Sequence, residues 1–394
     1  MAMETDLGAP RDARFRTVLL LVAAVAVLIL FLIQVSRGDV GGPDVFRFLH
    51  VAQVSGPWRD VPIEYAPGEF LLIRVLFDTG SEQTAAARLA LLAFAGHVAT
   101  WGGVRWGWGR SAGDRYLIAA LPLLLLVYER IDLIPVAVAT WGLALAVRGR
   151  PRGAGAVLAA AVLIKLWPVV LLPGLLLRGG RRAAAWFAGV MLAGGLAWAV
   201  YGGAGAPGQV LTFRGARGWE AGSSVGVVAW ILGGGPLRQE AGSARVGFAP
   251  TWAKVLLGVA LGALLIAIWM RARARDDDPG GRPALAAVAA LLLCTPLFST
   301  QYATWLLPWA GVTSARDRDA GALAAVLVVG AATATLDLAG YEPGTDVTAQ
   351  IATLIRIVAL AWLVGRGLLV RDVTTRPAPA PPRPRASSPP RSAA

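Results

Sequence analysis

Four carboxylates stand among aromatic residues and prolines in the stretch Gly38–Gly68, directly after the first long apolar segment. They are Asp39, Asp44, Asp60 and Glu64. A carboxylate at a membrane surface can take the proton of a substrate hydroxyl, which is the chemistry of a general base. Asp44 is the first candidate for that role and Asp39 is the second. The same stretch allows a short surface helix over residues 45–54, and Asp44 would then be its N-cap residue.

Polar residues also interrupt three apolar segments, at 128–132, 165–168 and 299–302. Each segment lies between two arginine clusters, and only 25 residues separate Arg152 from Arg178. Two half-helices of about 11 residues reach about 16 Å each, roughly half of the hydrocarbon core. Such a pair enters the membrane and returns, and irregular backbone at that depth is stable only inside protein or beside a water-filled cavity. The pattern predicts an internal polar cavity open to the outer side, with ordinary short external turns as the alternative.

The composition places these elements in a membrane. Of the 394 residues, 56% are apolar and 15% are charged, and the mean hydropathy is +0.60. Soluble domains are less apolar and carry about 25% charged residues. The sequence therefore predicts an all-α polytopic membrane protein with about 10–13 transmembrane helices, short or broken half-helices included.

An uninterrupted apolar run at 18–33 predicts the first span. Arginines precede it and no good cleavage site follows it, so we expect an uncleaved helix and a cytoplasmic N-terminus. We expect three parts in the chain. These are a cytoplasmic N-terminus at 1–16, a transmembrane domain at 17–371 with outer loops at about 35–83 and 202–250, and a disordered Pro/Arg-rich cytoplasmic tail at 372–394.

The net charge of +13 has two possible meanings. A soluble protein this basic would suggest a nucleic-acid partner, whereas a membrane protein concentrates arginine in its cytoplasmic loops. In the predicted topology the inner side carries 24 basic and 10 acidic residues, and the remainder carries 13 and 14. The charge therefore follows the topology, and we expect a membrane environment and no nucleic-acid partner.

The cysteine and histidine content limits metal chemistry. Cys294 is the single cysteine, and His50 and His97 are the two histidines. One cysteine excludes an intramolecular disulfide and a cysteine metal site, and two histidines argue against a histidine cluster. We expect neither a metal nor a cofactor.

The order of several motifs resembles glycosyltransferase family 87. The first group follows the first span and consists of Asp44, Val45, Phe48, Gly56-Pro57-Trp58-Arg59-Asp60, Glu64-Tyr65 and Pro67. Three later groups are similar as well: Lys165-Leu166-Trp167-Pro168, Arg217-Gly218-Trp219-Glu220 with Ser223, and Ser299-Thr300-Gln301-Tyr302 with Trp305. The similarity extends from about residue 15 to about residue 370. The chain departs from the family's common pattern at Ala66, Gly222 and Thr300.

The resemblance implies a GT-C-class fold and a sugar transfer at the outer face of the plasma membrane. Members of this family use polyprenyl-phosphate sugars, typically the mannose form, as donors. The implied reaction is an inverting displacement, in which a hydroxyl of a lipid or glycan acceptor attacks the anomeric carbon and the lipid phosphate leaves. The expected donor sugar is a hexose, with mannose as the first choice.

The resemblance also implies roles for individual residues. Asp44, or else Asp39, takes the proton of the acceptor hydroxyl. Cations offset the charge that develops on the phosphate, and the candidates are Arg214, Arg217 and Lys165. The alternative for Lys165 is a side chain that extends to the membrane surface. The remaining candidates orient the acceptor or brace the loop, and they are Arg59, Asp60, Glu64, Tyr65, Gln301 and Tyr302.

Two other functions stay open on the sequence alone. Broken helices with polar residues at their turns are also used by secondary transporters, and a lipid flippase is a related alternative. The departures at Ala66, Gly222 and Thr300 fit a non-catalytic membrane protein of envelope assembly.

Overall fold

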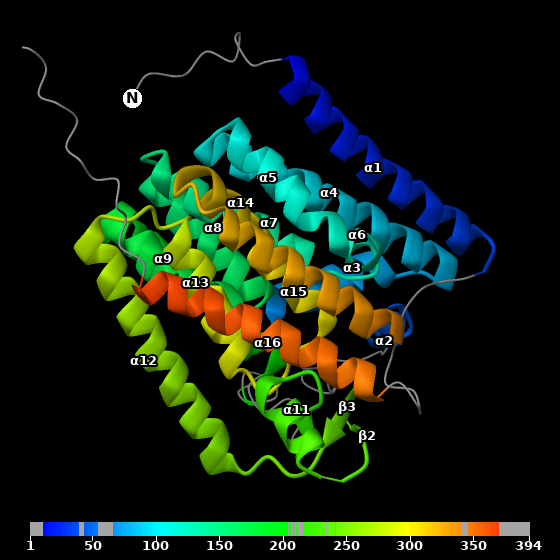
Figure 1. The fold of residues 1–394 in the computed structure, drawn as a ribbon. Coiled ribbons are helices and arrows are strands. Elements are labelled where there is room, and N and C mark those ends of the chain that lie inside the picture. The colour runs from blue at the N-terminus through cyan, green and yellow to red at the C-terminus, as the bar shows by residue number, and fades with distance from the viewer. Residues whose placement is uncertain are drawn as a thin grey trace, which may run out of the picture.

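The computed structural model describes residues 11–38, 43–53, 66–203, 205, 208, 210, 216–233, 235–240, 242–339 and 346–369. Helices form most of this part (Figure 1). Five of them are long and apolar enough to cross a membrane by length and composition. They are α1 (Arg11–Ser36), α9 (Leu172–Gly202) with the preceding η4 (Trp167–Leu171), α12 (Thr251–Arg275), α15 (Ala320–Ala339) and α16 (Asp346–Leu369).

The outward faces of these helices explain why they need a membrane. Val255, Leu256 and Val259 of α12 are exposed, as are many apolar residues of α1 and α9. Apolar surface of this extent is unfavourable in water and is compatible with lipid. The prediction of an all-α polytopic membrane protein is therefore confirmed.

Three half-helix pairs make up the interior of the bundle, as the arginine spacing predicted. The first pair contains α5 (Arg110–Ala120), η3 (Leu121–Leu123), α6 (Leu124–Val127) and α7 (Leu133–Val147). The second contains α8 (Pro151–Ile164), η4 and the beginning of α9. The third contains α13 (Arg282–Cys294), η6 (Thr300–Leu306) and α14 (Leu307–Arg316). Pro168 and Pro308 stand in the first turn of returning segments, where proline favours the start of a helix.

Hydrogen bonds show that the two ends of a pair lie together. The guanidinium Nε of Arg148, after the first pair, donates to the carbonyl oxygen of Trp106, which precedes that pair, at 2.8 Å. The backbone N–H of Arg282, at the start of the third pair, donates to the carboxylate of Asp317 at 3.2 Å. The chain therefore enters the bundle and returns to the same end.

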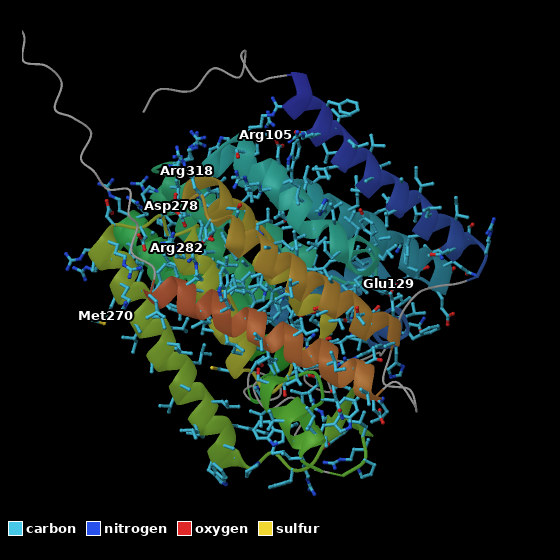
Figure 2. The ribbon with its side chains drawn as sticks, viewed as in Figure 1. Arg105, Glu129, Met270, Asp278, Arg282 and Arg318 are labelled. Carbon is cyan, nitrogen blue, oxygen red and sulfur yellow. The ribbon has the colours of Figure 1, made fainter. Side chains whose placement is uncertain are left out.

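That end carries the arginine clusters and is called the basic end here; it comprises residues 105–115, 148–152, 178–182, 271–282 and 316–319. Arg105, Asp278, Arg282 and Arg318 gather there, and Glu129 lies toward the opposite end (Figure 2). Trp108 Nε1 donates to the Asp278 carboxylate at 3.0 Å, and this bond joins two of the clusters. A shared end is what the positive-inside rule requires of loops on one side of a membrane.

α4 (Glu82–Trp108) and the kinked α9 connect these pairs to the rest of the bundle. Inside α9, Gly180 has φ 57° and ψ −153°, a left-handed φ that favours glycine. This kink separates the returning half of the second pair from the longer segment that continues to Gly202. The helices α8 and α9, α4 and α7, α7 and α8, and α5 and α14 pack along one another.

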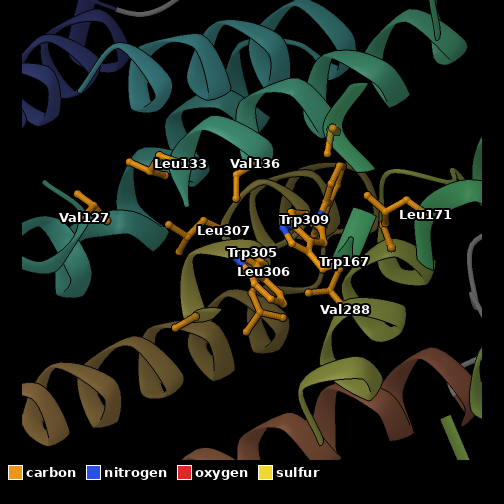
Figure 3. Packing of buried hydrophobic residues seen from close by; sticks show 14 of the residues in the cluster. Val127, Leu133, Val136, Trp167, Leu171, Val288, Trp305, Leu306, Leu307 and Trp309 are labelled. Carbon is orange, nitrogen blue, oxygen red and sulfur yellow. The ribbon is translucent and has the colours of Figure 1, made fainter. Parts of the chain in front are cut away.

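Large apolar side chains fill the space where the three pairs meet (Figure 3). The first pair supplies Val127, Leu133 and Val136, the second supplies Trp167 and Leu171, and the third supplies Val288, Trp305, Leu306, Leu307 and Trp309. Burial of these side chains removes apolar surface from contact with solvent and fixes the pairs relative to one another.

Two short helices, α2 (Pro43–Gln53) and α3 (Pro67–Phe77), follow α1. The short helix expected over 45–54 is present but begins at Pro43, since proline is favoured at the first helical position. Asp44 therefore lies in the first turn of α2, and the interpretation of Asp44 as the N-cap residue is wrong. Phe48 of α2 packs edge-on against Phe77 of α3, with ring centroids 5.3 Å apart.

A small antiparallel sheet, which the sequence did not predict, lies between α9 and α12. Its strand order is β1 (Trp219–Glu220), β3 (Ser243–Val246) and β2 (Arg238–Glu240). The strands are only two to four residues long, too short for an alternating hydrophobic pattern to be visible. Helix α11 (Ser224–Ile231) follows β1 and packs against α16.

Candidate functional site

A cavity of about 630 Å³ lies where the three half-helix pairs reverse. The sequence predicted an internal polar cavity at these reversals, and the structure confirms the cavity; its opening to the outer side stays a prediction. Residues of α2, α3, the small sheet and α12 complete the wall. The polar and aromatic lining residues include Arg47, Phe48, Glu69, Arg130, Asp132, Lys165, Trp167, Glu220, Ser243, Arg245, Ser299, Gln301, Tyr302 and Trp305.

Lys165 stands directly after α8, where the extended backbone ends the helix (φ −149°, ψ 134°). Its Nζ atom lies 3.0 Å from each of the two Asp132 carboxylate oxygens. The same Nζ atom lies 3.6 Å from Glu69 Oε1. Lys165 is therefore held inside the cavity and does not extend to a membrane surface.

Asp132 also receives a hydrogen bond from the third pair. Trp305 Nε1 donates to Asp132 Oδ1 at 2.8 Å. The Trp305 ring stacks on Tyr302 with a centroid distance of 4.1 Å and on Trp167 with a centroid distance of 5.0 Å. The ammonium of Lys165 lies 5.4 Å from the centre of the Tyr302 ring, close enough for a cation–π attraction.

The charges that line the cavity leave a small positive excess. The cations are Arg47, Arg130, Lys165 and Arg245, and the carboxylates are Glu69, Asp132 and Glu220. Arg130 Nη2 lies 3.9 Å from Asp337 Oδ1, and Arg245 Nη1 donates to the carbonyl oxygen of Gly218 at 2.9 Å. Fixed cations in a partly enclosed space attract an anionic group more strongly than they would in open water.

Glu220 joins the small sheet to the third pair. Its Oε2 atom accepts a hydrogen bond from the backbone N–H of Phe298 at 3.0 Å. Burial raises the pKa of the Glu220 carboxyl, and the Phe298 hydrogen bond and the positive charge of Arg356 oppose this rise. Arg356 of α16 lies over the Phe298 ring, with its guanidinium carbon 3.7 Å from the ring centre. These contacts fix β1 against the wall of the cavity.

The cavity also has apolar lining residues. Val169 and Val170 of η4, Leu261 and Leu265 of α12, and Leu291 of α13 line it. The lining thus combines charged and apolar side chains, and this combination suits a molecule that has an anionic head and a hydrocarbon tail.

The structure brings together some of the predicted site residues. Lys165, Gln301 and Tyr302 line the cavity. Arg217 is exposed and is not among the lining residues. Asp44 stands one helical turn before the lining residues Arg47 and Phe48 of α2, and its side chain is outside the described part. Six further candidates lie outside the described residues: Asp39, Arg59, Asp60, Glu64, Tyr65 and Arg214.

Sequence reasoning assigned no role to Glu69 and Asp132. Glu69 begins the otherwise mainly apolar run of α3, and an isolated acid in such a run is a signal of function. Both side chains are buried. In the described ranges, no group of three or more His, Cys, Asp or Glu side chains is placed to hold a metal ion.

Glu240 anchors the segment that precedes β1. Its carboxylate accepts hydrogen bonds from the backbone N–H groups of Arg217 at 2.6 Å and of Gly218 at 3.0 Å. These bonds, that of Arg217 first, lower the pKa of the Glu240 carboxyl. A lowered pKa means that the ionised form stabilises the loop at neutral pH, and that this contribution is lost as the pH falls through the folded-state pKa.

The replacement Glu240→Gln should therefore lower the protection of the Arg217 and Gly218 amides, measured relative to their intrinsic exchange rates, near neutral pH. It should also reduce the further loss of protection on acidification. Hydrogen–deuterium exchange measured over a pH series tests this. Glu82→Gln, at the exposed start of α4, is the control and should leave exchange at Arg217 and Gly218 unchanged. Equal exchange in the Glu240→Gln protein and the unsubstituted protein would contradict the assigned anchor.

The chain matches the model of one known protein family. The model of glycosyltransferase family 87 matches residues 65–300. The matched range contains Glu69, Asp132, Lys165, Glu220 and Arg245, and it ends where the third pair reverses. No curated protein matches the chain.

Proposed function

Because the chain belongs to glycosyltransferase family 87, we propose that this membrane glycosyltransferase takes a hexose, with mannose as the first choice, from a polyprenyl-phosphate donor. The acceptor is a lipid or a glycan at the outer face of the plasma membrane. The fold would then be of the GT-C class, with the transmembrane domain at 17–371 between a cytoplasmic N-terminus and a cytoplasmic tail.

The mixed lining of the cavity is the observation that carries this proposal. Its charged residues include Arg47, Arg130, Lys165 and Arg245, and its apolar residues include those of η4, α12 and α13. A polyprenyl-phosphate sugar has an anionic phosphate between a polar sugar and a hydrocarbon chain, so the lining offers charged side chains for the phosphate and apolar side chains for the hydrocarbon chain. The basic end, turned to the cytoplasm by the positive-inside rule, supports a reaction on the opposite side.

The proposed step breaks the bond between the anomeric carbon and the phosphate oxygen. The acceptor oxygen forms the new bond at the opposite face of the same carbon, which inverts its configuration. The acceptor proton passes to Asp44, or else to Asp39, and the polyprenyl phosphate leaves with the bonding electron pair. Lys165 and the lining arginines stabilise the charge that develops on the leaving phosphate.

Other predicted residues keep secondary roles in this proposal. Gln301 and Tyr302 line the cavity and can hydrogen-bond sugar hydroxyls. Arg59, Asp60, Glu64 and Tyr65 orient the acceptor or brace the loop. Arg214 and Arg217 stay candidates for the donor phosphate, and Arg47, Arg130 and Arg245 join them because they line the cavity.

The replacement Asp44→Asn tests the proposed reaction. Asparagine keeps the size of the side chain and removes its ability to take a proton, so transfer should fall by about 100-fold or more. Donor binding should be retained, because the cationic residues that line the cavity are unchanged. The measurement is the transfer of label from radiolabelled polyprenyl-phosphate mannose to lipid or glycan acceptors in membranes that contain the protein.

Asp39→Asn is the matched control, since it removes the neighbouring carboxylate of the same stretch. A large loss with Asp39→Asn and none with Asp44→Asn would reassign the base. Undiminished transfer by both single variants and by the double variant would exclude both Asp44 and Asp39 as the general base. Absence of label transfer to any acceptor by the unsubstituted protein would argue against the proposed donor.

A further inference from the structure

All three half-helix pairs contribute to one buried ion pair. Asp132 comes from the first pair, Lys165 from the second and Trp305 from the third. Asp132 is 1% exposed. Its two oxygens lie 3.0 Å from Lys165 Nζ, and its Oδ1 atom also accepts the 2.8 Å hydrogen bond from Trp305 Nε1.

A buried carboxylate is unfavourable unless hydrogen bonds and an opposite charge compensate for the lost water. Lys165 and Trp305 supply both kinds of compensation to Asp132. The contacts also restrict the lysine, because both carboxylate oxygens engage the same ammonium group. An ammonium has three N–H donors, and the 3.6 Å distance to Glu69 Oε1 is longer than a hydrogen bond. One N–H can therefore turn toward an anion in the cavity.

The contacts of Asp132 argue against it as the group that accepts the substrate proton. Lys165 and Trp305 already donate to its oxygens. The role of Asp132 must then be exerted through Lys165.

We propose that Asp132 is the positioning residue that holds the Lys165 ammonium where it binds the phosphate of the lipid-linked donor. Asp132 acts through Lys165 and does not touch the substrate. The hydrogen bond from Trp305 to Asp132 fixes the Asp132–Lys165 pair relative to the third pair, whose Gln301 and Tyr302 line the same cavity. This inference rests on the proposed function, because it takes the donor phosphate as the ligand of Lys165.

The test uses the full chain purified in detergent and two readouts. One is the thermal unfolding midpoint. The other is the ratio of the dissociation constants for polyprenol and for polyprenyl phosphate, two probes that differ only in the anionic group. The variants are Asp132→Asn, Lys165→Met and the double variant, and Asp319→Asn is the matched control. Asp319 is also a buried, paired aspartate, 2.7 Å from Arg366 Nη2, but it lies at the basic end.

Each single variant at the pair should lower the unfolding midpoint, because it leaves one buried charge without its partner, and the double variant should recover much of that loss. Lys165→Met should reduce the preference for polyprenyl phosphate by about tenfold or more. Asp132→Asn should reduce it by a similar factor, and the double variant should be no worse than Lys165→Met alone. Asp319→Asn should lower the midpoint and leave the preference unchanged.

Asp132→Glu provides a second route if Asp132→Asn does not fold. It keeps the charge and lengthens the side chain by one methylene group, so the protein should fold with a displaced ammonium and a reduced phosphate preference.

Three results would overturn the proposal. In the first, Asp132→Asn is destabilised but keeps the full phosphate preference, as expected of a purely structural residue. In the second, the double variant shows the product of the two single effects, as expected of independent contacts. In the third, the unsubstituted protein binds polyprenol and polyprenyl phosphate equally. Failure of the proposed function is distinguishable, because it gives no label transfer while the coupled phosphate preference persists.

Discussion

Replacement of Lys165 by methionine should lower the rate of sugar transfer by about 100-fold or more. Methionine fills a similar volume and removes the ammonium, which is the lining cation held in place by two carboxylates. The leaving phosphate then loses a nearby positive charge at the moment its own negative charge develops. The maximal rate should fall more than the apparent donor affinity, because arginines also line the cavity.

The chain offers a matched control for this variant, because Lys254 is its only other lysine. Lys254 Nζ donates to the carbonyl oxygen of Ala216 at 3.0 Å, and Lys254 is not among the cavity-lining residues. Lys254→Met should therefore transfer sugar at nearly the unsubstituted rate. Initial rates of label transfer, normalised to the amount of folded protein, measure both variants. Comparable rates for Lys165→Met and Lys254→Met would remove Lys165 from the reaction.

The replacement Gly155→Ala should destabilise the protein by about 1–3 kcal/mol. A Cβ atom at Gly155 of α8 would lie 2.2 Å from the carbonyl oxygen of Ala183 and 3.0 Å from the backbone nitrogen of Phe187, both in α9. Backbone atoms cannot rotate away as the end of a side chain can, so α8 and α9 would have to separate. Because Lys165 follows α8 directly, transfer should fall together with stability.

Gly189→Ala is the control for the glycine variant. Gly189 lies in α9, and a Cβ atom there meets no heavy atom within 4 Å. Alanine favours a helix more than glycine does by about 1 kcal/mol, so Gly189→Ala should be neutral or slightly stabilising. The thermal unfolding midpoints of Gly155→Ala and Gly189→Ala, measured in the same detergent, test this difference in stability. An equal midpoint for the two variants would show that α8 and α9 are not packed this closely.

The half-helix pairs could be predicted because local features define them. Arginine clusters mark the ends of each pair, and the 25 residues between Arg152 and Arg178 are too few for two full spans. The polar residues at the reversals then require a buried setting. The helix over residues 43–53 was also predictable in outline, but its start was misplaced by two residues, because Pro43 begins the helix.

The rest of the site depends on contacts between distant parts of the chain. Trp305 and Asp132 are 173 positions apart, and no local pattern indicates that they are hydrogen-bonded. Arg47 of α2, Arg130 of the first reversal and Arg245 of β3 lie far apart in the sequence, so their common cavity follows only from the packing of these segments. Arg217 was chosen for its place in a motif, whereas Arg245 of the adjacent strand lines the cavity.

The meeting of the three half-helix pairs at Asp132 also sets an order of events during synthesis. Asp132 and Lys165 leave the ribosome first and can pair with each other. Trp305 is synthesised only after residues 202–250 and α12 have been made. Until α13 and η6 insert, the ion pair lacks its hydrogen bond from Trp305 and part of its apolar cover. A nascent chain that stops before the third pair therefore holds an ion pair at membrane depth without its full compensation, an arrangement that is unfavourable until the third pair is in place.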